Sequence, residues 1–315
     1  MAWGNECISK GLPAGVVAGV LIAALRYAGR HIGFPLVMTM THHSVIAWIL
    51  NYLVEIGVIL ACLLGACVVI ALPPRCLPVK SLGGALVIAG AIACLIDVGS
   101  LAAFSITGNS SFEIDLARVA LYAPLDLLEF CGLSLAGGVL VYSRLCRERM
   151  PVDGWLWSIL AGLGMAVATY ACYRALYISD DGIFRSSMGV TLYSLSLDAL
   201  PVFAGVLTGI VSAVLTGRKT ALPLHLALLA GLSGAMAGVL SAAFIAWFNF
   251  AQSGYDSIWV TNGIYLLYNA MRVVDSTTMF AMLAIAGGIS CAYVSGRLPR
   301  GTVVDLRADA RRKKG

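Results

Sequence analysis

The stretch "APLDLLEFCGLSLAGG", residues 123–138, determines how the whole chain should be interpreted. It is apolar over most of its length, yet it contains Asp126 and Glu129, three residues apart. Side chains at that spacing are neighbours on a helix surface, so both carboxylates would point in roughly the same direction. Pro124 precedes them, and a Gly-Gly pair follows. Whether these carboxylates are unusual depends on whether the helix crosses a membrane.

The composition of the chain indicates a membrane protein. Hydrophobic residues make up 60% of the chain and charged residues only 12%, whereas about a quarter of the residues in soluble domains are charged. A helix needs about 20 mostly apolar residues to cross the hydrocarbon core of a bilayer. Eight runs are long enough: residues 11–29, 44–72, 81–107, 117–143, 155–178, 188–216, 222–250 and 258–296. The sequence therefore predicts an all-α, polytopic helical membrane protein with about eight transmembrane helices and the lipid bilayer as its partner.

The last run is too long for a single straight span. Its first part, residues 258–270, carries Trp259, Tyr265 and Tyr268, and such aromatic residues gather at membrane–water interfaces. We therefore expect an interfacial segment before the eighth span.

The loops between the runs differ in charge. The loops "PPRCLPVK", "SRLCRERM" and "TGRKTALP" are basic, whereas "GNSSFEID", "ISDDGIF" and "AQSGYDS" are acidic or neutral. Basic residues in short loops stay on the cytoplasmic side of a membrane. This rule predicts a multi-pass protein of the cell membrane with both termini in the cytoplasm. Arg26, Arg30 and His31, between the first two runs, are the exception to the rule.

The runs and their loops indicate two copies of a four-helix unit. Several residues match at a register of 148 to 150, among them Arg26 with Arg174, and "LAGG" at 135–138 matches "IAGG" at 285–288. Chance similarity between Ala-, Gly- and Leu-rich helices is the alternative. Two parallel halves would be related by an axis along the membrane normal. The predicted parts are a first membrane half (1–150), a second membrane half (151–298) and a basic cytoplasmic tail (299–315).

Six acidic residues fall inside the predicted spans, where a charge at the bilayer centre costs at least about 2.5–3.5 kcal/mol on insertion scales. They are Glu55, Asp97, Asp126, Glu129, Asp198 and Asp275. In the second run, Ser44, Asn51 and Glu55 are seven and four residues apart, which places them on one helical face. Charged residues in a span usually face the interior of the bundle.

Two interpretations of these residues remain open. In the first, they line a polar path or pocket that binds a substrate between the halves, with Arg174 and Arg272 as countercharges and Arg26 and Arg118 nearer the ends of their runs. The residues of this predicted site are Asn51, Glu55, Asp126, Glu129, Asp198, Asp275, Arg174 and Arg272. In the second, Asp126 and Glu129 pair with Arg174 or Arg272 and fix how the halves dock.

The sequence carries no signature of a soluble enzyme, since GxxxxGK[ST], HExxH and GxSxG are all absent. The nine cysteines form no CxxC pair, which predicts neither a zinc site nor a disulfide framework. His42 and His43 are predicted at the opposite membrane face from His225, which argues against a haem held by two histidines. We predict no cofactor, no metal, no nucleic-acid partner and no catalysis. Work driven by ATP would need a partner subunit, in the membrane or the cytoplasm.

The opening stretch is similar to a segment of the SpoIIM-like membrane proteins (stage II sporulation protein M family), in which Pro-x-x-x-Leu-Glu precedes Ala-Gly. The matching residues are Pro124, Leu128, Glu129, Ala136 and Gly137. The histidine that usually follows the proline is Leu125 here, and in the second copy Met279 stands where Glu129 stands. The resemblance covers about twenty residues. It implies a helical membrane component with permease-like architecture, sometimes tied to envelope remodelling, and no particular substrate.

A second resemblance is to membrane subunits of the NrfD/DmsC type, which bind quinol and anchor iron–sulfur partners. It rests on two sets of four spans and on "APLDLLEF", which resembles the Ser-Pro-Leu…Glu start of their fourth span. The histidine expected near the end of the third span is absent from "LAAFSITG". A permease-like component is therefore the predicted function, with a quinol-binding anchor or a structural membrane scaffold as alternatives.

Overall fold

The structure is a computed structural model and describes eight stretches of chain: residues 2–39, 43–72, 79–106, 116–146, 154–183, 187–216, 223–252 and 263–296. Each contains one long helix. These are α1 (Ala2–Ala28), α3 (His43–Ala71), α4 (Val79–Ile106), α5 (Leu116–Cys146), α6 (Trp155–Ile183), α7 (Ser187–Thr216), α8 (Pro223–Gln252) and α10 (Gly263–Val294). A five-residue π-helix, η1 (Gly29–Gly33), and the short α2 (Phe34–Val37) follow α1. The described residues contain no strand, so the predicted all-α class is confirmed.

All eight long helices contain a segment that is long and apolar enough to cross a membrane. Their outer faces carry large exposed apolar side chains, for example Leu95 (65% exposed), Leu156 (67%) and Trp247 (68%). Monomeric soluble proteins rarely expose apolar patches of this extent, whereas lipid tails are as apolar as leucine. The chain is therefore a polytopic helical membrane protein whose perimeter contacts lipid.

The predicted interfacial segment before the eighth span lies partly in the last long helix. Residues 263–270 of the predicted interfacial segment belong to the continuous helix α10, whose apolar span begins at Leu267. The reason is local, because residues 263–270 contain no proline and their single glycine is the first residue of the helix. Residues 258–262 of that segment lie outside the described residues.

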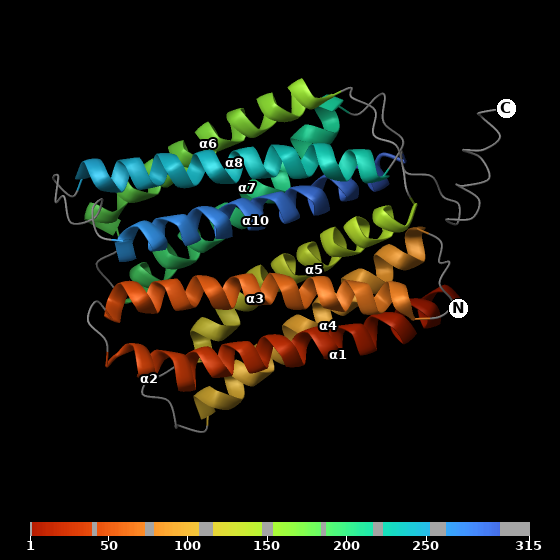
Figure 1. Ribbon diagram of the computed structural model, residues 1–315, viewed down its shortest axis with the longest axis horizontal. Helices are drawn as coiled ribbons and strands as arrows, with labels where there is room; N and C mark the ends of the chain where they lie inside the picture. Colours follow the sequence, from red (N-terminus) through yellow and green to blue (C-terminus); the bar gives the residue numbers. More distant parts are fainter. Residues whose placement is uncertain are drawn as a thin grey trace.

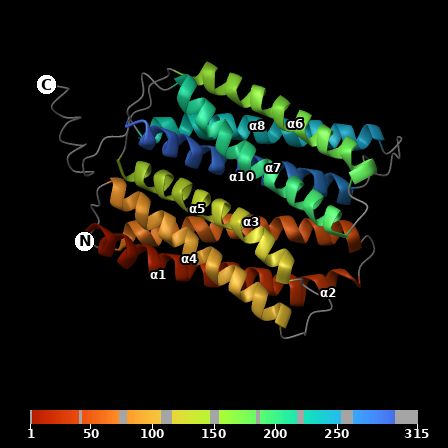
Figure 2. The same ribbon diagram turned by 180° about the vertical axis from the view of Figure 1, so that it is seen from behind.

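The long helices lie side by side in one bundle, with the earlier four and the later four on opposite sides of it (Figures 1 and 2). Helix α1 begins and α10 ends at the same end of the bundle (Figure 1). In the first set, α1 contacts α3 and α4, α5 contacts α3 and α4, and α3 contacts α4. In the second set, α6 contacts α7 and α8, α10 contacts α7 and α8, and α7 contacts α8. Within its own set, each helix therefore has the same neighbours as the helix four spans later.

Glycines bring α1 and α4 into close contact. A Cβ atom added at Gly11 would lie 2.6 Å from the carbonyl oxygen of Ala85, and one added at Gly15 would lie 2.6 Å from that of Ala89. Small residues four apart allow helix backbones to approach this closely in lipid. Both residue numbers increase together along the contact, so α1 and α4 run in the same direction, with their C-terminal ends adjacent.

The two Gly-Gly pairs lie in corresponding places. In α5, Gly137 faces Leu63 of α3, and Gly138 faces Leu86 of α4. Both glycines are buried at these helix contacts. A side chain at either position would therefore push α5 away from its two neighbours.

In α10, 150 residues later, the contacts are equivalent. Gly287 faces Val206 of α7, and Gly288 faces Ala230 of α8. Since α7 and α8 follow α3 and α4 by four spans each, matching glycines meet matching helices.

The segments before these glycines also correspond. Phe130 and Leu133 of α5 are fully buried, and so are Phe280 (2% exposed) and Leu283 of α10, again 150 residues later. Helices α5 and α10 contact each other at this level, where Gly132 meets the side chain of Leu283. The two sets of helices further meet through α3 with α10, and through α5 with α7 and α8.

Candidate functional site: an intramembrane acidic cluster

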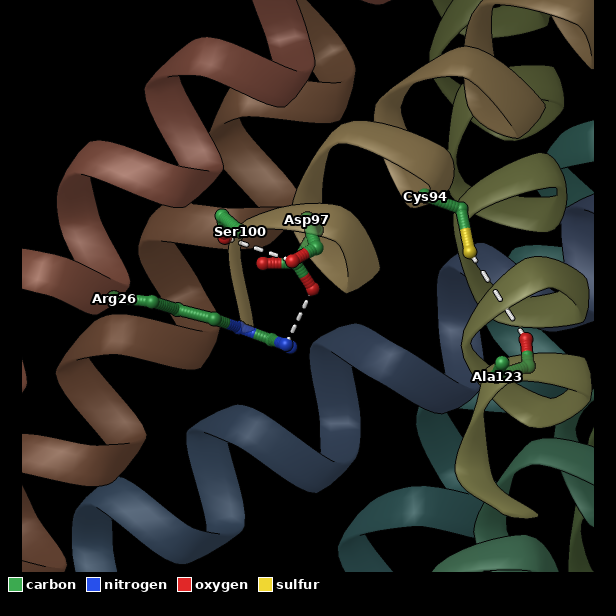
Figure 3. A network of polar contacts seen from close by, with 5 residues as sticks. All are labelled: Arg26, Cys94, Asp97, Ser100 and Ala123. Carbon is green, nitrogen blue, oxygen red and sulfur yellow. Dashed lines mark hydrogen bonds and ion pairs between the residues drawn. The ribbon is translucent and has the colours of Figure 1, made fainter. Parts of the chain in front are cut away.

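A buried ion pair joins the adjacent ends of α1 and α4. Nη1 of Arg26 donates a hydrogen bond to Oδ2 of Asp97 at 2.5 Å (Figure 3). The Asp97 side chain is fully buried, and that of Arg26 is 16% exposed. Arg26 lies in the last turn of α1, where a cation also interacts favourably with the negative end of the helix dipole. The glycine contacts between α1 and α4 bring these two side chains within reach.

The ion pair uses only one of the two carboxylate oxygens of Asp97. The second carboxylate oxygen of Asp97, Oδ1, is buried and accepts no hydrogen bond from any described residue. Ser100 donates to the backbone carbonyl of Asp97 at 2.7 Å and not to its carboxylate. The Arg26 guanidinium also lies 5.9 Å from the ring centroid of Phe130 on α5, within the distance of a cation–π interaction.

Other carboxyl groups lie within electrostatic range of Arg26. The guanidinium interacts with Glu55 of α3 and with Asp126 and Glu129 of α5, in addition to Asp97. In turn, Glu129 interacts with Glu55, Asp126 and Asp275 of α10. We call Glu55, Asp97, Asp126, Glu129, Asp198 and Asp275 the acidic cluster.

Asp198 and Asp275 bring the second set of helices to this cluster. Asp198 of α7 interacts electrostatically with Glu55 and Asp126. Asp275 of α10 interacts with Glu55 and Glu129. Five of the predicted site acids therefore gather where α3 and α5 meet α7 and α10.

The cluster lies at one depth in the bundle. Asp198 is five residues inside the start of its span, and Glu129 is ten residues inside the start of its own. Asp97 is six residues from the end of its span, which runs in the opposite direction. At a rise of about 1.5 Å per residue, these positions lie roughly 7–15 Å below the same end of the bundle. That end is the one where α1 finishes, so Arg26 reaches the acids from just above them.

The other predicted site residues are placed differently. Asn51 is exposed on α3. Arg174 of α6 is exposed, and its guanidinium lies 4.7 Å from the ring centroid of Phe248. Arg272 of α10 is half-buried and interacts electrostatically with Tyr52 of α3. Within the described part of the chain, neither arginine forms an ion pair with an acid of the cluster.

Arg26 and Asp97 were absent from the site predicted from the sequence. Arg26 was placed near the end of its run, which is correct, but its own position does not reveal which helix faces it. The glycine spacing in α1 is the signal that could have located its partner, because it indicates the face of close helix contact.

Two of the described cysteines, Cys62 and Cys94, lie within electrostatic range of acids of the cluster. The described cysteines are free thiols, and that of Cys94 donates to the carbonyl of Ala123 at 4.0 Å, which links α4 to α5 (Figure 3). Among the described residues, no three His, Cys, Asp or Glu side chains are placed to hold a metal ion together.

The chain matches no known family model, and neither a curated protein nor a solved structure is significantly similar to it.

Proposed function

We propose that this chain is a permease-like membrane component in which the acidic cluster receives a cation between two repeated four-helix halves. One observation carries the proposal: acids from both halves lie within electrostatic range of one another at one depth in the bundle. Intramembrane ionisable residues commonly mark the path of a substrate or an ion. A site shared between repeated halves is also the arrangement in which transporters alternate access by moving one half against the other.

The charge balance of the cluster favours a cationic ligand. At an effective dielectric constant of about 20, two like charges about 8 Å apart repel by roughly 2 kcal/mol. Several ionised carboxylates close together within the membrane-spanning segments therefore need positive charge, either as bound protons or as a bound cation. Arg26 is paired with Asp97, and within the described stretches Glu55, Asp126, Glu129 and Asp275 form no ion pair of their own.

The repeat gives the site a central position. Helix α5 of the first half and α10 of the second contact each other where Gly132 meets Leu283. Because these helices correspond at a register of 150, an axis relating the halves would pass between them. Glu129 is one turn from Gly132 on α5, so we place it beside this axis. Motion of one half relative to the other would therefore change the surroundings of Glu129.

Residues 123–138 and the loop charges extend the proposal. The similarity of that segment to SpoIIM-like proteins favours the same permease-like class, and Glu129 is one of the matching residues. The basic loops favour a location in the cell membrane with the cluster in its outer half and both termini in the cytoplasm.

Electrical recording on proteoliposomes tests the proposed function. The full chain is reconstituted on a solid-supported membrane, and currents are measured when methylguanidinium, methylammonium, potassium or protons are added rapidly. We expect a current with at least one of these cations. Glu129→Gln and Asp275→Asn should each reduce it by about tenfold or more, equivalent to about 1.4 kcal/mol.

Glu6→Gln is the matched control, because Glu6 is an exposed acid near the start of α1, far from the cluster along the helix. Its current should equal that of the unchanged protein. If folded wild-type protein gives no current above protein-free liposomes with any of the four cations, the permease proposal is wrong and a scaffold role is favoured.

A further inference from the structure

We propose that Arg26 determines the specificity of this site: its guanidinium occupies the position of the ligand, and the ligand is an organic cation that carries a guanidinium or ammonium group. This inference rests on the proposed function and adds the chemical class of the substrate. It also makes Arg26 a competitor that the substrate must displace.

The ion pair between Arg26 and Asp97 uses only part of the hydrogen-bonding capacity of the two groups. A guanidinium has five N–H donors in a rigid fork and can bind both oxygens of a carboxylate. In the described part of the chain, Arg26 makes one such bond, from Nη1 to Oδ2 of Asp97. The other oxygen, Oδ1, stays without a donor although Asp97 is fully buried. A buried acceptor without a partner is costly, so the site retains capacity to bind a further N–H group.

The chemistry around Arg26 suits an organic cation. Phe130 offers the face of an aromatic ring at 5.9 Å from the guanidinium, and Asp97, Glu55 and Glu129 supply negative charge from three helices. Carboxylates combined with an aromatic ring recognise guanidinium and alkylammonium groups, through charge-assisted hydrogen bonds and cation–π attraction. Arg26 is itself such a group, bound in the site.

The second half provides a matched comparison. Arg174 corresponds to Arg26 at a register of 148, but it is exposed and lies over the ring of Phe248. Among the described residues, Arg174 forms no ion pair, so removal of its guanidinium leaves no ionised partner behind in that part of the chain. We therefore expect an added cation to bind Arg26→Ala more tightly than the wild type, and Arg174→Ala no more tightly than the wild type.

Chemical rescue with methylguanidinium tests the inference. The full-length chain is purified in detergent as wild type, Arg26→Ala and Arg174→Ala. Thermal unfolding is followed against methylguanidinium chloride, with potassium chloride keeping the ionic strength constant. Because a ligand that binds only the folded state raises its stability, the unfolding midpoint of Arg26→Ala should rise and saturate. The apparent affinity of Arg26→Ala for methylguanidinium should be at least about tenfold higher than that of the wild type. Arg174→Ala should bind methylguanidinium as the wild type does.

Arg26→Gln keeps the inference testable if Arg26→Ala does not fold. Its amide can still donate to Asp97 while leaving the end of the guanidinium position empty. It too should bind methylguanidinium about tenfold more tightly than the wild type does. Equal affinities of folded Arg26→Gln and wild type, or an equal gain in Arg174→Ala, would overturn the inference.

The outcomes separate this inference from the proposed function. A wild-type cation current that Arg26→Gln leaves unchanged in size and selectivity, with no gain in methylguanidinium affinity, overturns the role of Arg26 alone. Saturable binding to Arg26→Ala without any wild-type current supports the ligand class and overturns the permease proposal.

Discussion

Arg26 and Arg174 occupy corresponding helices, α1 and α6, yet their surroundings are opposite. Arg26 is bonded to a fully buried aspartate of α4, whereas Arg174 is exposed and lies over Phe248 of α8. The same helix arrangement therefore accommodates Arg26 through an ion pair and Arg174 through an aromatic ring. The ion pair with Asp97 is therefore a feature of the surroundings of Arg26 and not of the helix arrangement itself.

The central helices of the two halves differ in a similar way. Phe130 of α5 and Phe280 of α10 are both buried, at a register of 150. The residue before each phenylalanine differs, however: it is Glu129 in α5 and Met279 in α10. At this position the buried phenylalanine is shared, whereas the carboxyl group is present only in α5. This difference is expected if packing maintains the phenylalanine and a ligand maintains the carboxyl group.

The largest expected effect contrasts the two arginines directly. Arg26→Met leaves Asp97 buried without its partner, and breaking one side of a buried pair costs about 3–5 kcal/mol. Arg174→Met removes a more exposed cation–π contact worth about 0.5–1 kcal/mol. Denaturation in mixed detergent micelles measures both losses.

The rescue variant sharpens that comparison. Arg26→Met combined with Asp97→Leu removes both charges, so its stability should return to within about 1 kcal/mol of the wild type. Equal losses for Arg26→Met and Arg174→Met would show that the two arginines have equivalent surroundings after all.

The next effect concerns the glycine contact that brings α1 against α4. In Gly15→Ala, the new Cβ would lie 2.6 Å from the carbonyl oxygen of Ala89, so the helices must separate. Overpacking of this kind costs about 1–3 kcal/mol. In Gly164→Ala on α6, the new Cβ meets nothing within 4 Å, and alanine's higher helix propensity should stabilise by up to about 1 kcal/mol. A Gly15→Ala protein as stable as Gly164→Ala would contradict the close contact between α1 and α4.

A smaller effect is expected at the Glu129 and Met279 positions. Glu129→Met introduces the side chain of similar volume that residue 279 carries. Because a carboxyl group outside an ion pair is costly to bury, its replacement by an apolar side chain should not lower the stability. Thermal unfolding should therefore show a stable protein, while the cation current is lost. A loss above about 3 kcal/mol would instead indicate that Glu129 is a member of a buried ion pair.

The smallest effect tests which end of the bundle faces outward. Thr39 follows α2 and Ser295 follows α10, and both are exposed. In a background without the native cysteines, Thr39→Cys should react with an impermeant thiol reagent in intact cells, and Ser295→Cys should not. Neither change should alter stability by more than about 0.5 kcal/mol. The reverse labelling pattern would invert the orientation and place the acidic cluster in the inner half of the membrane.

The sequence alone determined the membrane class, the long helices and the presence of acidic residues inside the apolar spans. Apolar length and helix length are local properties, which is why the predicted run 117–143 and the helix Leu116–Cys146 nearly coincide. Charges inside apolar runs are equally visible, so Glu55, Glu129 and Asp275 could be recognised as site candidates without a structure. The predicted interfacial segment, residues 258–270, overlaps the apolar span that begins at Leu267 by four residues, because aromatic residues mark an interface without showing where the span begins.

Only the tertiary structure decided which arginine belongs to the acids. From the sequence, Arg174 and Arg272 appeared deeper in their runs than Arg26, and depth was the available criterion. The structure pairs Arg26 with Asp97 because glycines four residues apart bring α1 against α4 in a parallel arrangement. Helix neighbours depend on contacts between residues far apart in the chain, here 71 residues apart, and no local pattern of charge or hydropathy records them.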